Sequence, residues 1–144
     1  MSTRCRIGIE HEDDTIESIY CHHDGYYSYV GKLLYMHYTD CEKIDKLMQL
    51  GDMSCLGTEP VDAGWNKHIP YNSISHFYMA CECFDEDDTE ARISHSRQEF
   101  GELTTKCDGE YAYLFSKEGK WLVSCIYNNE DFVELTKELC EKKN

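Results

Sequence analysis

The sequence lacks any long hydrophobic run, and this excludes two classes of protein. No window approaches the ~20 consecutive apolar residues that a membrane-spanning helix needs. The opening residues Met1-Ser2-Thr3-Arg4 lead directly into a strand-like pattern. They contain no apolar segment of about 7 to 15 residues, which a signal peptide requires. We therefore expect a protein of the cytoplasm, without a membrane partner.

Positive charge is scarce. The chain has 28 Asp and Glu against 14 Lys and Arg, which gives a net charge of −14. Such a surface repels phosphate backbones and anionic membranes, so direct binding to nucleic acid or to a membrane is not expected. Basic protein surfaces are attracted instead, including the nucleic-acid groove of another protein. The competing explanation is that acidity only keeps the protein soluble.

The familiar signatures of catalysis and cofactor binding are also missing. The glycines form no Walker motif, no dinucleotide-binding fingerprint and no Gly-x-Ser-x-Gly elbow. The acidic residues Glu10, Glu12, Asp13 and Asp14 do not have the spacing of a calcium loop. No cofactor is expected, and nothing in the sequence favours an enzyme.

Cysteine is abundant, with nine residues. In a reducing cytoplasm we expect free thiols, most of them small buried side chains. Cys81-Glu82-Cys83 has the tightest spacing, but structural zinc sites usually contain two Cys-x-x-Cys knuckles. Cys81 and Cys83 are therefore weak metal candidates, and a ligand set completed in space by His76, His22 or Cys107 stays open. A metal-stabilised structural domain is our third functional hypothesis.

The first part of the chain predicts a hairpin followed by two helices over residues 5–51. Residues 5–11 and 15–21 alternate as strands do, and the acidic residues 12–14 form the turn between them. After a corner at 22–27, apolar residues recur at helical spacing up to Tyr38. A capping box at Thr39–Glu42 starts the second helix, and Gly51 ends it.

The remainder of the chain is less regular. Residues 52–73 predict a long loop, and 74–84 a strand, with a helix as the weaker alternative. Residues 91–106 have no clean period and predict an irregular segment with one helical turn or a short edge strand, so 52–106 forms the middle of the domain. Residues 107–144 predict a second hairpin, with a turn at Gly119, and a closing helix capped by Asn129 or Asp131. We expect one α+β domain over residues 1–144, a single antiparallel sheet of about four to six strands with helices mainly on one face.

Two candidate sites emerge. The first is the corner Cys21-His22-His23-Asp24, which contains the residue types of a small catalytic or nucleotide-binding pocket. Adjacent residues on an extended segment point to opposite sides, so only one of the two histidines can join a given pocket. A corner histidine bonded to a backbone carbonyl is the simpler explanation.

The second candidate site is a surface for a protein partner. Tyrosine is enriched at interfaces because it combines a large contact area with a polar tip. Tyrosines beside acidic residues suit a groove rich in Arg and Lys. The residues that we expect at this surface are Tyr26, Tyr27, Asp85, Glu86, Asp87, Asp88 and Glu90.

The first 57 residues resemble a group of small uncharacterised proteins encoded by bacteriophages and other mobile elements. The motifs that carry the resemblance are Arg6-Ile-Gly-Ile-Glu10, Ile19-Tyr-Cys-His-His-Asp-Gly-Tyr26, Val30-Gly31, Leu34, His37-Tyr38-Thr39 and Leu50-Gly-Asp-Met-Ser-Cys-Leu-Gly57. In that group the corner commonly reads Cys-His-Trp-Asp-Gly-Tyr-Pro, so His23 stands in the Trp position and Tyr27 in the Pro position. The closing hairpin is similar in style.

The resemblance implies a context in which small phage proteins often antagonise host defence. Our leading hypothesis is therefore an accessory protein of the host cytoplasm that inhibits a defence system, of the anti-CRISPR or anti-restriction type. It would act by stoichiometric binding of its acidic surface to the basic groove of a host protein, such as an RNA-guided nuclease. The alternative is a small enzyme, or a protein that sequesters a nucleotide signal in the corner pocket.

Overall fold

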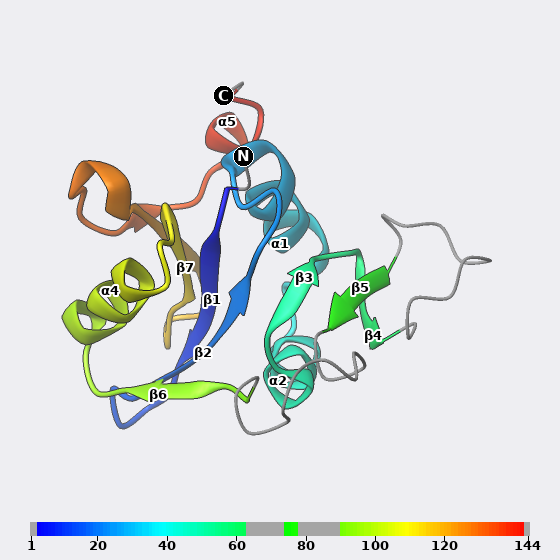
Figure 1. Cartoon of the computed structure of the whole chain (residues 1–144), viewed down its shortest axis with the longest axis horizontal. Helices are drawn as coiled ribbons and strands as arrows, with labels where there is room; N and C mark the ends of the chain where they lie inside the picture. The colour runs from blue at the N-terminus through cyan, green and yellow to red at the C-terminus, as the bar shows by residue number, and fades with distance from the viewer. Residues whose placement is uncertain (1–2, 63–73, 78–89, 143–144) are drawn as a thin grey trace.

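The computed structural model describes residues 3–62, 74–77 and 90–142, and in these ranges nine strands form one sheet (Figure 1). The strands are β1 (Cys5–Glu10), β2 (Ile16–Cys21), β3 (Met53–Cys55), β4 (Glu59–Asp62), β5 (Ile74–Phe77), β6 (Arg92–Ser94), β7 (Tyr111–Phe115), β8 (Trp121–Cys125) and β9 (Val133–Glu134). Their order is β4-β5-β3-β2-β1-β7-β8-β9, and β6 also pairs with β2.

Helices and helical turns connect these strands. They are the π-helical turn η1 (Tyr27–Gly31), α1 (Lys32–His37), α2 (Cys41–Leu50), α4 (Arg97–Lys106), the 3₁₀ turn η3 (Ile126–Asn128) and α5 (Lys137–Cys140). The α+β class predicted from the sequence is confirmed. The sheet is mixed rather than purely antiparallel, because β1 pairs in parallel with β7, as β2 does with β3 and β4 with β5.

Strand β1 lies at the centre of the sheet and is buried along its whole length. It pairs with β2 through the predicted hairpin and with β7 on its other edge. The alternation in its sequence divides its side chains between two faces: Cys5, Ile7 and Ile9 belong to the larger hydrophobic core, whereas Arg6 and Glu10 point to the opposite side.

Helices cover both faces of the sheet, mainly one of them. The larger core lies on the face that η1, α1, α2 and α5 cover. On the other face α4 packs against β6 and β7, and Phe100 of α4 joins Ile16, Ala112 and Leu114 in a second, smaller core. Gly8 makes room for this helix, because a Cβ atom there would lie 3.2 Å from the Phe100 ring.

Helix α2 is capped and terminated as predicted, except that the N-cap lies one residue later. The cap is Asp40 rather than Thr39: its carboxylate accepts a hydrogen bond of 3.1 Å from the backbone N–H of Glu42. Gly51 ends the helix with a φ of 84°, a conformation that costs glycine little.

Two local predictions are wrong and a third is incomplete. The expected loop after Gly51 contains β3 and β4, which join the sheet edge beyond β2. For residues 91–106, where at most one helical turn or a short edge strand was expected, the structure has both the three-residue strand β6 and the ten-residue helix α4. The hydroxyl of Ser96 caps α4 by accepting from Glu99 N–H at 3.0 Å. The closing helix does not start at Asn129 or Asp131, because β9 pairs with β8 there and the short α5 begins only after Thr136.

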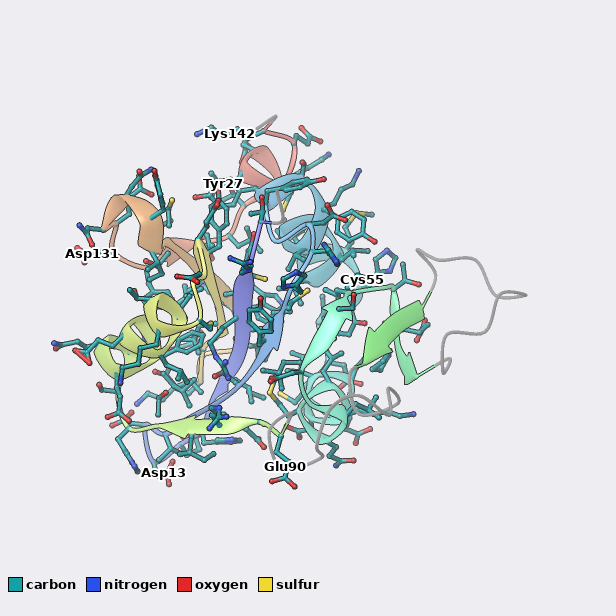
Figure 2. All side chains as sticks on the ribbon, viewed as in Figure 1. Asp13, Tyr27, Cys55, Glu90, Asp131 and Lys142 are labelled. Atoms are coloured by element: carbon teal, nitrogen blue, oxygen red, sulfur yellow. The ribbon has the colours of Figure 1, made fainter. Side chains whose placement is uncertain are left out.

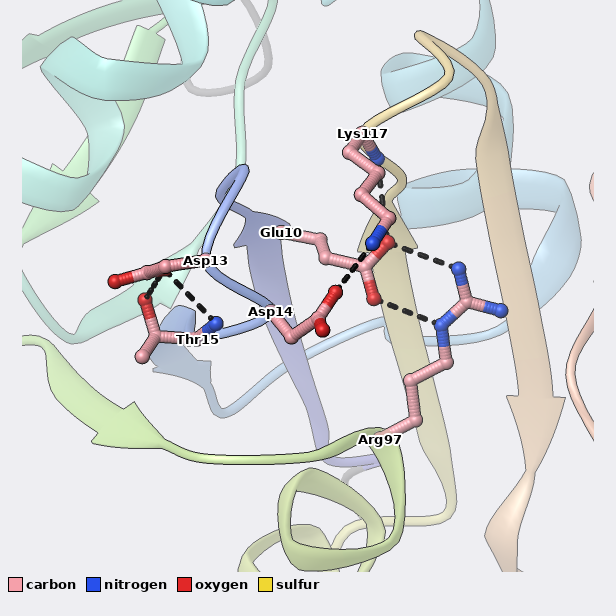
Figure 3. A network of polar contacts seen from close by, with 6 residues as sticks. All are labelled: Glu10, Asp13, Asp14, Thr15, Arg97 and Lys117. Carbon is pink, nitrogen blue, oxygen red and sulfur yellow. Dashed lines mark hydrogen bonds and ion pairs between the residues drawn. The ribbon is translucent and has the colours of Figure 1, made fainter.

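A buried carboxylate joins three segments on the α4 side of the sheet (Figure 3). Glu10, at the end of β1, accepts two hydrogen bonds of 2.9 Å from the guanidinium of Arg97, the first residue of α4. It also accepts a 3.2 Å bond from the backbone N–H of Lys117, in the turn after β7. The Lys117 side chain pairs with Asp14, so the acidic hairpin turn belongs to this network.

We predict that Arg97→Met lowers the free energy of unfolding by about 2 kcal/mol at pH 7, because it leaves a buried carboxylate without its cation. The bonds from Arg97 hold the Glu10 pKa below its usual value. The contribution is therefore present above about pH 4.5 and is lost as the pH falls further. Denaturant unfolding at pH 7 and at pH 3.5 measures the difference.

The matched control is Lys120→Met, which breaks an ion pair of 3.6 Å with Glu134 between side chains that are 66% and 56% exposed. An exposed pair contributes at most about 0.5 kcal/mol. Equal effects of the two substitutions would contradict the assignment of the Glu10 network as a structural link.

Candidate functional site

The register of the first hairpin gathers four polar side chains on one face of the sheet. Arg6 lies directly opposite Tyr20, and the next pair of positions on the same face is Arg4 and His22. Alternation along both strands therefore aligns two arginines with two aromatic side chains. This group lies on the α4 face of the sheet, beyond the C-terminal end of α4.

These side chains line a hollow of about 410 Å³. The remaining residues come from three other parts of the fold: the start of β3, strand β6 and the turn that follows α4. The lining residues are Arg4, Arg6, Tyr20, His22, Asp52, Arg92, Cys107 and Asp108. Segments distant in the sequence thus meet at one place.

The hollow lies where the neighbour of β2 changes. Strand β6 pairs with residues 16–18 of β2, whereas β3 pairs with β2 only at Cys21. Between them the backbone N–H of Tyr20 donates a hydrogen bond of 2.8 Å to the carboxylate of Asp52. Burial raises the Asp52 pKa to about 6, although the N–H of Tyr20, Arg6 and Arg92 all favour the charged form.

Arg6 is the most deeply buried cation of the hollow, with 2% of its surface exposed. Its Nε donates to the Ser18 hydroxyl at 3.0 Å and its Nη2 to the Ser18 carbonyl at 2.9 Å. Cys107 lies close enough that Arg6 favours its thiolate, but burial dominates and raises the pKa of this thiol. The thiol is therefore protonated at neutral pH and unsuited to act as a nucleophile.

His22 is the one member of the predicted corner that lines the hollow. Burial, with smaller effects of His23 and Arg4, lowers its pKa, so the ring is neutral at pH 7. Tyr20 Oη lies 2.6 Å from His22 Nδ1. With Tyr20 as the donor, the proton of the neutral ring is on Nε2, which then has a donor for a ligand.

The other corner residues do not join His22 in one pocket. Cys21 is fully buried in the larger core, and its thiol donates to the His23 carbonyl at 3.6 Å. The His23 ring contacts His22 edge-on, with 4.6 Å between centroids. Asp24 supplies backbone structure, because its carbonyl accepts from Val30 N–H at 3.2 Å. The alternation of an extended segment accounts for this separation.

Asp24 and Gly25 make separate contributions to the corner. The positive φ that the turn needs is adopted by Asp24, at 59°. Gly25 is required for close approach, since a Cβ atom there would lie 2.8 Å from the carbonyl oxygen of Thr3 and 2.9 Å from Cβ of Cys5. This contact holds the corner against the start of β1.

The predicted partner-binding residues have different surroundings. Tyr26 is half-buried, and Glu90 is exposed, with its side chain pointing outward where β6 begins (Figure 2). Tyr27 is 8% exposed and packs edge-on against Tyr111, with 4.8 Å between ring centroids, so it offers little surface to a partner. Asp85, Glu86, Asp87 and Asp88, like Cys81 and Cys83, lie outside the described residues.

Sequence reasoning identified His22 but missed the arginines beside it. The signal was present for Arg4 and Arg6, because the predicted hairpin and its turn fix which residues face Tyr20 and His22. No local sequence pattern indicates that Asp52 and Arg92 lie in the hollow. Their positions depend on β6 pairing with one part of β2 and β3 with another.

Among the residues that the structure describes, no three His, Cys, Asp or Glu side chains are grouped closely enough to hold a metal ion. In the same ranges no helix has both the length and the apolar character needed to cross a bilayer.

Comparison of the chain with family models, curated proteins and solved structures finds no match in any of the three.

We predict that Asp52→Asn raises the free energy of unfolding at pH 7, by at most about 3 kcal/mol. The amide oxygen still accepts from Tyr20, whereas the poorly solvated charge is removed. Because the Asp52 pKa is raised from 3.8 to about 6, the folded state holds the proton more tightly and wild-type stability falls as the pH rises through this window.

Thermal or denaturant unfolding at pH 4 and pH 7 checks this, and the gain should disappear at pH 4. Asp45→Asn, at an exposed position of α2, is the control and should change stability by less than about 0.5 kcal/mol. If the Asp52 variant is no more stable than wild type at pH 7, burial of the Asp52 carboxylate does not destabilise the folded state, and the prediction is wrong.

Proposed function

We propose that this chain is a phage-type accessory protein that inhibits a host defence system by binding one of its proteins stoichiometrically. The observation that carries the proposal is the net charge of −14. Charge of this magnitude attracts a basic groove over a distance of several ångströms and accelerates association. The groove of an RNA-guided nuclease or a restriction enzyme has the complementary charge, because it binds phosphate backbones.

The described surface contains a segment with the expected character. Tyr127 is 80% exposed in η3, and the exposed acidic residues Glu130 and Asp131 follow it after two asparagines. Asp131 lies at the periphery of the fold (Figure 2). An exposed aromatic ring beside carboxylates suits arginine, which stacks on the ring and pairs with the acid. It adds to the partner-binding residues expected from the sequence, Tyr26, Asp85, Glu86, Asp87, Asp88 and Glu90.

The alternative function, a small-molecule pocket at the corner, has one supporting observation. Of its four residues, only His22 faces a hollow, and arginines line that hollow. The separation of Cys21 from His22 argues against a nucleophile–base pair, so this alternative favours binding over catalysis.

Capture of host proteins on the immobilised chain tests the proposal. We expect a nucleic-acid-handling partner whose affinity falls at least tenfold between about 0.1 and 0.5 M salt. Added chain should also release nucleic acid from that partner. Binding that is indifferent to salt, or that leaves the partner's nucleic acid in place, would contradict the proposal.

Charge-neutralising variants locate the surface. The test variant combines Asp85→Asn, Glu86→Gln, Asp87→Asn, Asp88→Asn and Glu90→Gln. The matched control removes the same charge at scattered exposed positions: Glu12→Gln, Asp45→Asn, Glu102→Gln, Glu118→Gln and Glu138→Gln. We expect the test variant to weaken binding at least tenfold more than the control does. Equal losses would show that total charge, and not this segment, determines binding.

A further inference from the structure

Three of the four arginines of the chain line one hollow. Arg4, Arg6 and Arg92 meet there, whereas Arg97 is bound to Glu10 in the structural network. In a chain with twice as many acidic as basic residues, such a concentration of guanidinium groups is unlike the rest of the molecule. We propose that the hollow binds the phosphate group of a mononucleotide-sized ligand, with Arg4, Arg6 and Arg92 as its phosphate-binding residues.

Arg6 is pre-organised for this role. Its Nε and Nη2 both donate to Ser18, and the thiol of Cys107 is a further hydrogen-bonding neighbour. Within the described residues no carboxylate forms an ion pair with its guanidinium, although the charge of Asp52 in the same hollow interacts with it. A guanidinium that is 2% exposed and has no carboxylate in direct contact is costly, and a bound phosphate would add negative charge beside it. Its position is fixed before a ligand arrives, so little side-chain entropy is lost on binding.

Arg92 and Arg4 flank Arg6 with donors still available. Arg92 lies on β6 opposite Ser18, and within the described residues its side chain makes no hydrogen bond and no ion pair, although its charge interacts with that of Asp52. Arg4 has one acidic neighbour, Asp108, at 3.9 Å, and the Asp108 side chain is 84% exposed. Planar guanidinium groups match phosphate oxygens in geometry and remain charged at any physiological pH.

The aromatic wall and the size of the hollow favour a nucleotide over a free phosphate ion. The rings of Tyr20 and His22 lie 5.9 Å apart and are joined by the Tyr20–His22 hydrogen bond. Aromatic rings beside a phosphate-binding group offer a face on which a base stacks. The hollow, of about 410 Å³ and broadly open to solvent, has room for a group larger than phosphate. The negative charge of Asp52 repels an anionic ligand, so removing that charge should strengthen binding.

The experiment titrates the isotope-labelled full chain, without any protein partner, with adenosine monophosphate, inorganic phosphate and adenosine. Backbone amide signals of Arg6, Tyr20 and His22 report on the site. We expect saturable shifts with adenosine monophosphate and weaker binding of phosphate, by at least fivefold. Adenosine should bind least, because it lacks the charged group. Equal affinity for phosphate and the nucleotide would support the arginine site but refute the nucleotide as its ligand.

Variants test the residues. Arg4→Gln and Arg92→Gln should each weaken nucleotide binding about fivefold to tenfold, and Asp52→Asn should strengthen it severalfold. Lys46→Gln, an exposed position of α2 outside the hollow, removes the same charge and should change affinity less than twofold. Absence of saturable shifts at about 10 mM nucleotide, or an equal loss in the Lys46 variant, would overturn the proposal. Because no host protein is present, this outcome is independent of the proposed inhibitory function.

Discussion

Strand β1 places a buried acid, Glu10, and a buried base, Arg6, on the same face of the sheet. The packing on that face depends on which groups bind each charge. Glu10 is 8% exposed and obtains a full partner in Arg97 at the start of α4. Arg6 is 2% exposed and donates to the hydroxyl and carbonyl of Ser18, with Cys107 and the carboxylate of Asp52 near it but no ion pair within the described residues. Gly8 lies between them and leaves room for Phe100. The face is therefore divided into a half packed by α4 and a polar half that remains a hollow.

Local patterns in the sequence predicted the parts of the fold that depend on neighbouring residues. The first hairpin, its acidic turn and the termination of α2 at Gly51 follow from alternation, turn chemistry and a positive φ. The parallel pairing of β1 with β7 could not be predicted in this way. It joins residues about one hundred positions apart, and β7 arrives only after α4 has crossed the other face.

The errors near the end of the chain have a physical cause. Phe132, Leu135 and Leu139 fit a helical spacing, but Leu135 N–H instead donates to the Trp121 carbonyl beside β8, at 2.9 Å. Tertiary pairing thus outweighed local periodicity. The same limit applied to the candidate site: His22 was found by its residue type, Arg6 was within reach of the hairpin register, and Arg92 depended on an edge that no local pattern specifies.

Salt affects the acidic surface and the arginine hollow to different degrees, and this difference separates the two interactions physically. Attraction of a net charge of −14 to a basic groove acts between exposed charges, so salt screens it and weakens binding. The same net charge repels an anionic ligand as it approaches the hollow, and salt reduces that repulsion. Contacts with the buried Arg6 are screened much less once they form. Moderate salt should therefore weaken the first interaction while leaving the second nearly unchanged, which means that one chain can carry both without one requiring the other.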